Sequence, residues 1–229
     1  MRKKLLIVEG KEDQSLILAL LQKIMNAKKS KETSEEHQII IEIADNKIYV
    51  HDSESDNNAF KKFTTTIKNR EEYSHIGIIV DVDGSEKDKK SIHSRWQSFC
   101  EIAKKDFGYK LPKNFDKTKL NFQSDNDFAK IGLWLMPDNQ SQGMLEDFVR
   151  KMIKSDDKLH LHAEDIVNNL PERRFGKTYT SKAIIHTWLA WQKQPNVDIY
   201  KGIDNKYFDV ETELCNNFIE WIKDLFEIQ

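Results

Sequence analysis

The chain has 229 residues, enough for one large domain or for one domain with a small appendage. Charged residues make up 32% of it, but 36 Lys and Arg nearly balance 38 Asp and Glu, which leaves a formal net charge of −2. This balance argues against a protein that coats nucleic acid and leaves room only for local basic patches.

The placement of the cysteines and the length of the apolar runs indicate the cellular compartment. Cys100 and Cys215 are far apart on stretches that read as amphipathic helices, which predicts buried thiols rather than a disulfide or a metal site. No apolar run approaches the length of a membrane span, and the basic start at residues 1–4 lacks the apolar core of a signal peptide. We therefore expect a cytoplasmic protein that has no membrane partner.

Strand and helix patterns alternate in the first part of the chain. Short apolar runs predict buried strands at residues 4–8, 39–43 and 76–80. Apolar residues at three- and four-residue spacing predict a helix over residues 17–25 and another that carries Phe60, Phe63 and Ile67. Residues 26–36 are polar and rich in lysine, which predicts an exposed loop.

The alternation continues to about residue 153 and then stops. It includes a helix face around residues 92–103, a strand at 131–136 closed by Pro137, and a helix over 145–152. Beyond Ser155 only helices are predicted, over residues 165–170, 181–192 and 211–226.

This order predicts an α/β fold with a mainly parallel sheet flanked by helices. We expect an α/β domain at residues 1–153 and a helical C-terminal extension at residues 154–229 packed on it.

Acidic residues follow two of the predicted strands. Glu9 comes directly after residues 4–8, and Asp81 and Asp83 follow residues 76–80. Ligands of parallel sheets bind at the carboxyl ends of the strands. Two carboxylates one residue apart repel each other unless a cation lies between them, and Mg²⁺ is the usual choice. The alternative is that Glu9 caps the following helix and that the Asp pair sits in a turn.

Two motifs resemble the Toprim family, the catalytic core shared by topoisomerases, primases and the overcoming-lysogenization-defect (OLD) nucleases. They are residues 5–11 (LLIVEGK) and 78–84 (IIVDVDG), and the resemblance covers roughly residues 1–150. It implies a Toprim-like, Rossmann-like fold. Many Toprim proteins carry a third acid where this chain has Ser85, and nucleases of the group manage without it, so a nuclease is favoured over a topoisomerase.

The Toprim resemblance implies roles for particular residues. Glu9 would be the general acid/base or a metal ligand, and Asp81 and Asp83 would hold Mg²⁺ or Mn²⁺. The metal would stabilise charge on phosphate oxygens during phosphodiester cleavage. In the same motif, Gly10 and Lys11 are candidates for binding phosphate.

Three further segments resemble an uncharacterised Toprim-like bacterial and archaeal family related to OLD-type nucleases. They are residues 133–139 (LWLMPDN), 143–148 (GMLEDF) and 182–190 (KAIIHTWLA). The resemblance implies that Glu146 is a further metal ligand. The alternative is a purely structural role, because the helix dipole favours an acid in a first helical turn. It also makes Lys182 the candidate catalytic and phosphate-binding lysine, against the alternative of a solvated charge.

The resemblance implies a metal-dependent nuclease, with DNA favoured over RNA as its substrate. OLD-type relatives join this core to an AAA-type ATPase, so we expect a separately encoded ATPase partner and a role in anti-phage defence. A homo-oligomer is left open. The alternatives are a non-catalytic Toprim scaffold, a phosphotransfer receiver, which would need an Asp where Leu133 stands, and a haloacid-dehalogenase-like phosphatase that uses Asp81 and Asp83.

Overall fold

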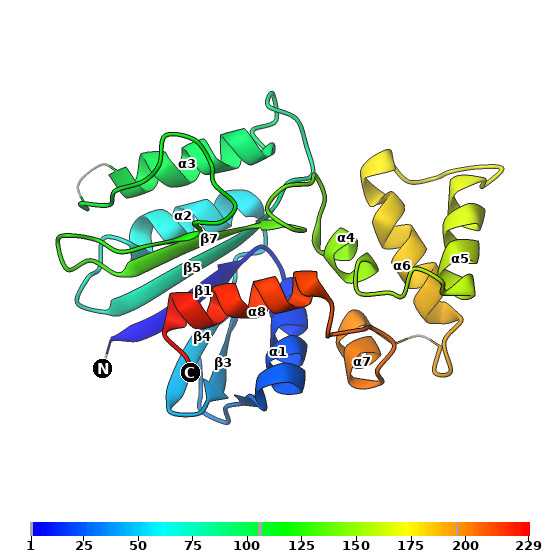
Figure 1. Cartoon of the computed structure of the whole chain (residues 1–229), viewed down its shortest axis with the longest axis horizontal. Helices are drawn as coiled ribbons and strands as arrows, with labels where there is room; N and C mark the ends of the chain where they lie inside the picture. The colour runs from blue at the N-terminus through cyan, green and yellow to red at the C-terminus, as the bar shows by residue number, and fades with distance from the viewer. Residues whose placement is uncertain (1, 105–106, 196) are drawn as a thin grey trace.

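The structure is a computed structural model that describes residues 2–104, 107–195 and 197–229. These residues form one mixed sheet with helices on both faces and further helices at its side (Figure 1). In spatial order the strands are β2 (Lys28–Lys29), β3 (Gln38–Ile43), β4 (Asn46–Asp52), β1 (Lys3–Val8), β5 (Tyr73–Asp81), β7 (Lys130–Met136) and β6 (Asn121–Phe122).

The central part of the sheet is parallel, as the sequence predicts. Strands β4, β1, β5 and β7 all run in one direction, so their carboxyl ends lie along one edge. The helices are α1 (Lys11–Met25), α2 (Asp56–Thr66), α3 (Ile92–Lys104), α4 (Leu145–Arg150), α5 (Lys158–Asn168), the 3-10 helix η1 (Lys177–Tyr179), α6 (Thr180–Ala190), α7 (Ile199–Asp204) and α8 (Glu213–Phe226).

The strict alternation of strands and helices is wrong in the first half of the chain. β3 and β4 form an antiparallel hairpin that turns at Ala44, which has a positive φ of 49°. The missed strand, β4, carries alternate buried residues at Ile48, Val50 and Asp52, the pattern of a strand whose two faces differ. The strand is hard to see in the sequence because its apolar residues are confined to 48–50.

Other element boundaries also differ from the predictions. The expected loop at 26–36 contains β2, which pairs antiparallel with β3. The helix predicted over 165–170 begins at Lys158, where Asp157 caps it by accepting a hydrogen bond from the N–H of His160 at 2.8 Å. Helix α7 was not expected.

Two separate apolar clusters cover the two faces of the sheet. On one face α2 and α3 pack with a ring cluster in which Phe63 and Phe99 stack at 5.2 Å and Trp96 lies 5.7 Å from Phe99. On the other face lie α1 and α8, and the same cluster runs on into α4 to α7. The sheet is therefore buried on both sides.

Helix α8 approaches the sheet closely because two glycines face it. Gly77 of β5 and Gly132 of β7 are direct neighbours in register. A Cβ at Gly77 would lie 2.7 Å from the Leu225 side chain, and one at Gly132 would lie 3.0 Å from it. The C-terminal helix is thus seated in the α/β layer, although it follows the expected boundary at residue 153.

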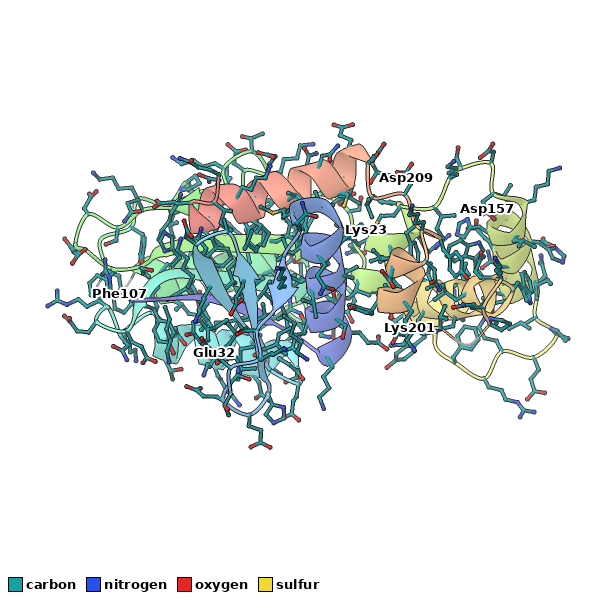
Figure 2. The ribbon with its side chains drawn as sticks, turned by 90° about the horizontal axis from the view of Figure 1, so that it is seen from below. Lys23, Glu32, Phe107, Asp157, Lys201 and Asp209 are labelled. Atoms are coloured by element: carbon teal, nitrogen blue, oxygen red, sulfur yellow. The ribbon has the colours of Figure 1, made fainter. Side chains whose placement is uncertain are left out.

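Helices α5 and α6 lie beside the sheet rather than over it. Seen from below, α5, with Asp157 at its start, stands clear of the strands, and α7 lies next to α1 (Figure 2). The Lys23 ammonium donates to the carbonyl of Asp204 across the α1–α7 contact at 3.4 Å. In the described part of the chain, no helix combines the length and the apolarity needed to cross a bilayer.

Candidate metal centre

The site begins at the carboxyl end of β1, the central strand. Glu9 follows β1 directly, and its Oε1 accepts a hydrogen bond at 2.8 Å from the backbone N–H of Asp81, at the end of the neighbouring strand β5. Gly10 then turns the chain into α1. The two acids that the sequence places 72 residues apart are therefore in direct contact.

Asp13 closes the first turn of α1 beneath Glu9. Its Oδ2 accepts the N–H of Gly10 at 2.9 Å, and its side chain is buried. A carboxylate in the first turn is stabilised by the helix dipole, but here it also adds a buried negative charge next to Glu9.

The turn after β5 ties the Asp81–Asp83 pair to the start of α4. Val82 exchanges two backbone hydrogen bonds with Gly143, at 2.9 and 2.8 Å. Gly143 precedes α4, whose first turn carries Glu146, a residue that is only 4% exposed. This bridge brings the third predicted acidic segment to the same edge of the sheet.

Burial and mutual repulsion raise the pKa values of three of these carboxyls. Burial, reinforced by the charges of Asp56 and Asp83, raises the pKa of Glu9 to about 7, against the N–H of Asp81 and the Arg95 charge. Burial, with the charge of Glu9, raises the pKa of Asp13 to about 8.

The Asp81 carboxyl is also disfavoured in its charged form. Burial, followed by the charges of Asp13 and Glu9, raises its pKa well above the usual range. Its Oδ1 is buried and has no hydrogen-bond partner within the described residues. Such an oxygen is costly to bury unpaired, so a group that supplies positive charge would stabilise it.

Three cations lie around the acids. Arg95 of α3 is 4% exposed; its Nη2 is 2.9 Å from Asp56 and 3.9 Å from Glu9, and its Nε donates to the Asp81 carbonyl at 3.1 Å. Lys90 lies 3.1 Å from Oδ1 of Asp83. These two cations hold the β5 side of the site.

Lys182 lies on the opposite side and joins two elements. Its ammonium is 3.2 Å from Oε1 of Glu146 and 2.9 Å from Oε2 of Glu12. Burial disfavours its charge, but the hydrogen bond to Glu12 and the charge of Glu146 leave its pKa above the usual value. The N-terminal turn of α6 is thereby attached to α1 and α4.

As the side chains lie, the acids do not converge on one point. Across the described ranges, no group of three or more His, Cys, Asp or Glu side chains is placed to hold a metal ion. The reason is visible in the contacts: Glu9 turns to the Asp81 N–H, Asp83 to Lys90, and Glu146 to Lys182. The chemistry of the donor set and the orphaned Oδ1 of Asp81 nevertheless fit a hard divalent cation.

Residues 3–227, nearly the whole chain, match the sequence family described as "Protein of unknown function (DUF3226)". The chain belongs to the DUF3226 family. None of the curated proteins matches it in sequence.

Two solved structures resemble this DUF3226 chain. A hypothetical protein from Pyrococcus horikoshii OT3 has a TM-score of 0.48 and 15% identity, over 99% of this chain and 90% of that one. The fosfomycin resistance protein FosX from Listeria monocytogenes has a TM-score of 0.20 and 16% identity, over 66% of this chain and 96% of its own.

Two of the residues expected to bind phosphate flank the acids of this DUF3226 chain in different ways. The N–H of Gly10 is engaged by Asp13, so it could meet a phosphate only if that bond opened. Lys11 is exposed in the first turn of α1. Of the three residues expected to bind phosphate, Lys182 is the one in contact with an acid of the site, Glu146 at 3.2 Å.

Sequence reasoning missed Asp13, Asp56 and Arg95. Asp13 stands three residues after Gly10, a spacing typical of a helix start, and that signal points to capping rather than to a site. Asp56 and Arg95 meet across 39 residues, on α2 and α3, and no local pattern in the sequence connects them. Their ion pair becomes visible only once both helices lie on the same face of the sheet.

Proposed function

We propose that this protein is a metal-dependent nuclease of Toprim-like fold that cleaves nucleic-acid phosphodiesters. The observation that carries the proposal is the buried Oδ1 of Asp81, which has no partner among the described residues and lies in a field of other carboxylates. A divalent cation is the group that best relieves this arrangement, because it takes carboxylate oxygens and retains sites for water or phosphate.

In this proposal, Glu9, Asp81 and Asp83 hold Mg²⁺ or Mn²⁺, with Glu146 as a further ligand. The metal supplies positive charge for the phosphate oxygens and a more acidic bound water. Support for the metal roles comes from the shared edge of the sheet: β1 and β5 end side by side, and the Val82–Gly143 bridge adds α4.

The chain's own side chains have distinct tasks in the proposal. In the metal-free protein Glu9 has a pKa of about 7, so it carries a proton part of the time near neutral pH and loses that proton when it binds the metal. Lys182 leaves Glu146 and Glu12 to meet a phosphate oxygen. Arg95 stays in place, because it is buried and fixes Asp56 and the Asp81 carbonyl at once.

A nuclease assay tests the proposal. The purified chain is incubated with plasmid and with DNA and RNA oligonucleotides, in Mg²⁺, in Mn²⁺ and in EDTA. We expect metal-dependent cleavage that is lost in Glu9→Gln and in Asp81→Asn and kept in Asp45→Asn, which changes an exposed aspartate. Cleavage that survives in Asp81→Asn would sink the assignment.

A non-catalytic scaffold is the second candidate, and one observation favours it. Lys90, Lys182 and Arg95 already neutralise part of the acidic charge without a metal. A scaffold predicts neither metal binding nor cleavage, whereas the nuclease predicts both. The resemblance to OLD-type nucleases extends the nuclease proposal to a separately encoded AAA-type ATPase partner and to anti-phage defence.

A further inference from the structure

A basic strip lies next to the acids, on the segment that leads into α6. Residues 171–182 contain four cationic side chains (Arg173, Arg174, Lys177 and Lys182) and one carboxylate (Glu172), a net charge of +3 in a chain whose formal charge is −2. This concentration of charge is local, which is the form that the overall composition leaves open for an anionic partner.

The segment is anchored to the acids at its C-terminal end. Ser181 donates a hydrogen bond to Asp147, and Lys182 lies 3.2 Å from Glu146. Because η1 runs directly into α6, the rise of about 1.5–2 Å per residue places Lys177 roughly 8–10 Å along the helix axis from Lys182. The strip therefore begins at the acids and leads away from them.

The cations of this segment divide into a fixed one and exposed ones. Arg173 donates to the carbonyl of Val167 at 3.3 Å and lies 5.4 Å from the Phe175 ring, so it holds the loop in shape. Arg174 is 85% exposed and pairs with the exposed Glu172, an ion pair that water screens and that a phosphate can replace. Lys177 is also exposed.

An aromatic ring stands among these cations. Tyr179 is 56% exposed, although a ring of this size is usually buried to a large extent. Cations that follow a backbone, interleaved with an exposed aromatic ring, are the arrangement by which proteins bind single-stranded nucleic acid.

We propose that residues 174–182 bind a single strand of nucleic acid and lead it to the acids. Arg174 and Lys177 contact phosphates, and Tyr179 stacks against an unpaired base. This inference rests on the proposed nuclease function and specifies its substrate as single-stranded. A duplex can satisfy the cations, but its paired bases do not offer a face to Tyr179, and an acidic protein surface has no base to stack.

The test separates binding from cleavage. Fluorescence anisotropy measures the Kd for a labelled oligo-dT of about 20 nucleotides, the matching RNA, and a duplex of the same length. All proteins carry Asp81→Asn and the buffer contains EDTA, so that the strand stays intact whatever the metal site does. Thermal melting confirms that each variant is folded.

Tyr179→Ala is expected to weaken binding of the single strand roughly 5- to 100-fold, and Tyr179→Phe to retain it, because phenylalanine keeps the stacking face. Lys177→Ala and Arg174→Ala are each expected to weaken binding and to reduce the salt slope by about one. Lys28→Ala and Lys29→Ala, exposed lysines on the edge strand β2, are matched controls that should leave the Kd unchanged.

Equal affinity for single strand and duplex, or an unchanged Kd in Tyr179→Ala, would overturn the proposal. An equal loss of affinity in the β2 controls and in Lys177→Ala would also overturn it, because the nucleic acid would then bind to basic side chains anywhere on the surface. Failure here is distinguishable from failure of the metal site: wild-type protein that binds Mn²⁺ but not the strand refutes the strip alone, and the reverse result refutes the metal site alone.

Discussion

The Glu9 carboxylate accepts a hydrogen bond from the backbone N–H of Asp81 at 2.8 Å and so joins the ends of the two central parallel strands. The hydrogen bond itself favours the Glu9 carboxylate, but burial of Glu9 and Asp81 beside a third acid, Asp13, disfavours their charged forms. Folding supplies Arg95 and Lys90 as partial compensation and leaves Oδ1 of Asp81 without a partner.

The raised pKa values predict that the acids destabilise the metal-free protein at high pH. In the unfolded chain the pKa of Glu9 or Asp13 is about 4, and in the folded chain it is about 7 or 8. Between these values the folded state binds more protons than the unfolded state, so their contribution to stability is complete below about pH 4 and is lost as pH rises toward 8.

Asp13→Asn tests whether the buried acids lower the stability of the metal-free protein as pH rises. An amide keeps an acceptor for the Gly10 N–H and removes the charge, so in EDTA the variant should gain stability over wild type as pH rises from 5 to 8. The gain should be on the order of a few kcal/mol in the free energy of unfolding. Urea unfolding at several pH values measures it, with the exposed Asp45→Asn as control. A difference in the free energy of unfolding between Asp13→Asn and wild type that does not change with pH would contradict the account.

Arg95 should be the most important cation for folding. Arg95→Met leaves Asp56 and Glu9 without their buried partner, which is expected to cost about 3–5 kcal/mol. In a chain of this length that corresponds to a fall in Tm of roughly 10 °C. Differential scanning calorimetry compares it with Arg174→Met, an 85% exposed arginine, for which we expect almost no change. A similar fall in Tm in both variants would show that the loss of stability does not come from the burial of Arg95.

Gly143 is predicted to tolerate no side chain. Its φ is 153°, and a Cβ would lie 2.6 Å from Oδ2 of Asp147, which accepts the N–H of Met144 at 3.0 Å. Gly143→Ala should therefore destabilise the protein by roughly 1–3 kcal/mol. Gly176→Ala is the matched control, since the nearest atom to its Cβ would be 3.8 Å away. Chemical denaturation measures the free energy of unfolding of each variant, and only Gly143→Ala should show the loss.

Lys182→Met should separate metal binding from cleavage. The variant frees Glu146 from a competing cation, so the affinity for Mn²⁺ should stay the same or rise. Cleavage should fall at least tenfold, because the phosphate loses its cation. Lys193→Met, an exposed lysine beyond the end of α6, should change neither. Parallel loss of both properties in Lys182→Met would assign the lysine a structural role instead.

The acidic edge could be anticipated because it depends on local order: an apolar run followed directly by an acid marks a strand's carboxyl end. Glu9 and Asp81 were found in this way, and the parallel centre of the sheet places them together. Lys182 was a candidate only through the family resemblance, and Arg95 was missed, because both reach the acids only through the packing of α6 and α3. The β3–β4 hairpin was missed because its second strand has only three consecutive apolar residues, at 48–50, with polar residues on both sides.

Mn²⁺ binding, measured by electron paramagnetic resonance at pH 8, tests the central claim most directly because it needs neither a substrate nor a partner. We predict that the wild-type protein binds one Mn²⁺, that Asp81→Asn weakens binding at least tenfold, and that Asp45→Asn leaves it unchanged. Absence of binding by the wild-type protein, or equal affinity in Asp81→Asn, would contradict the account.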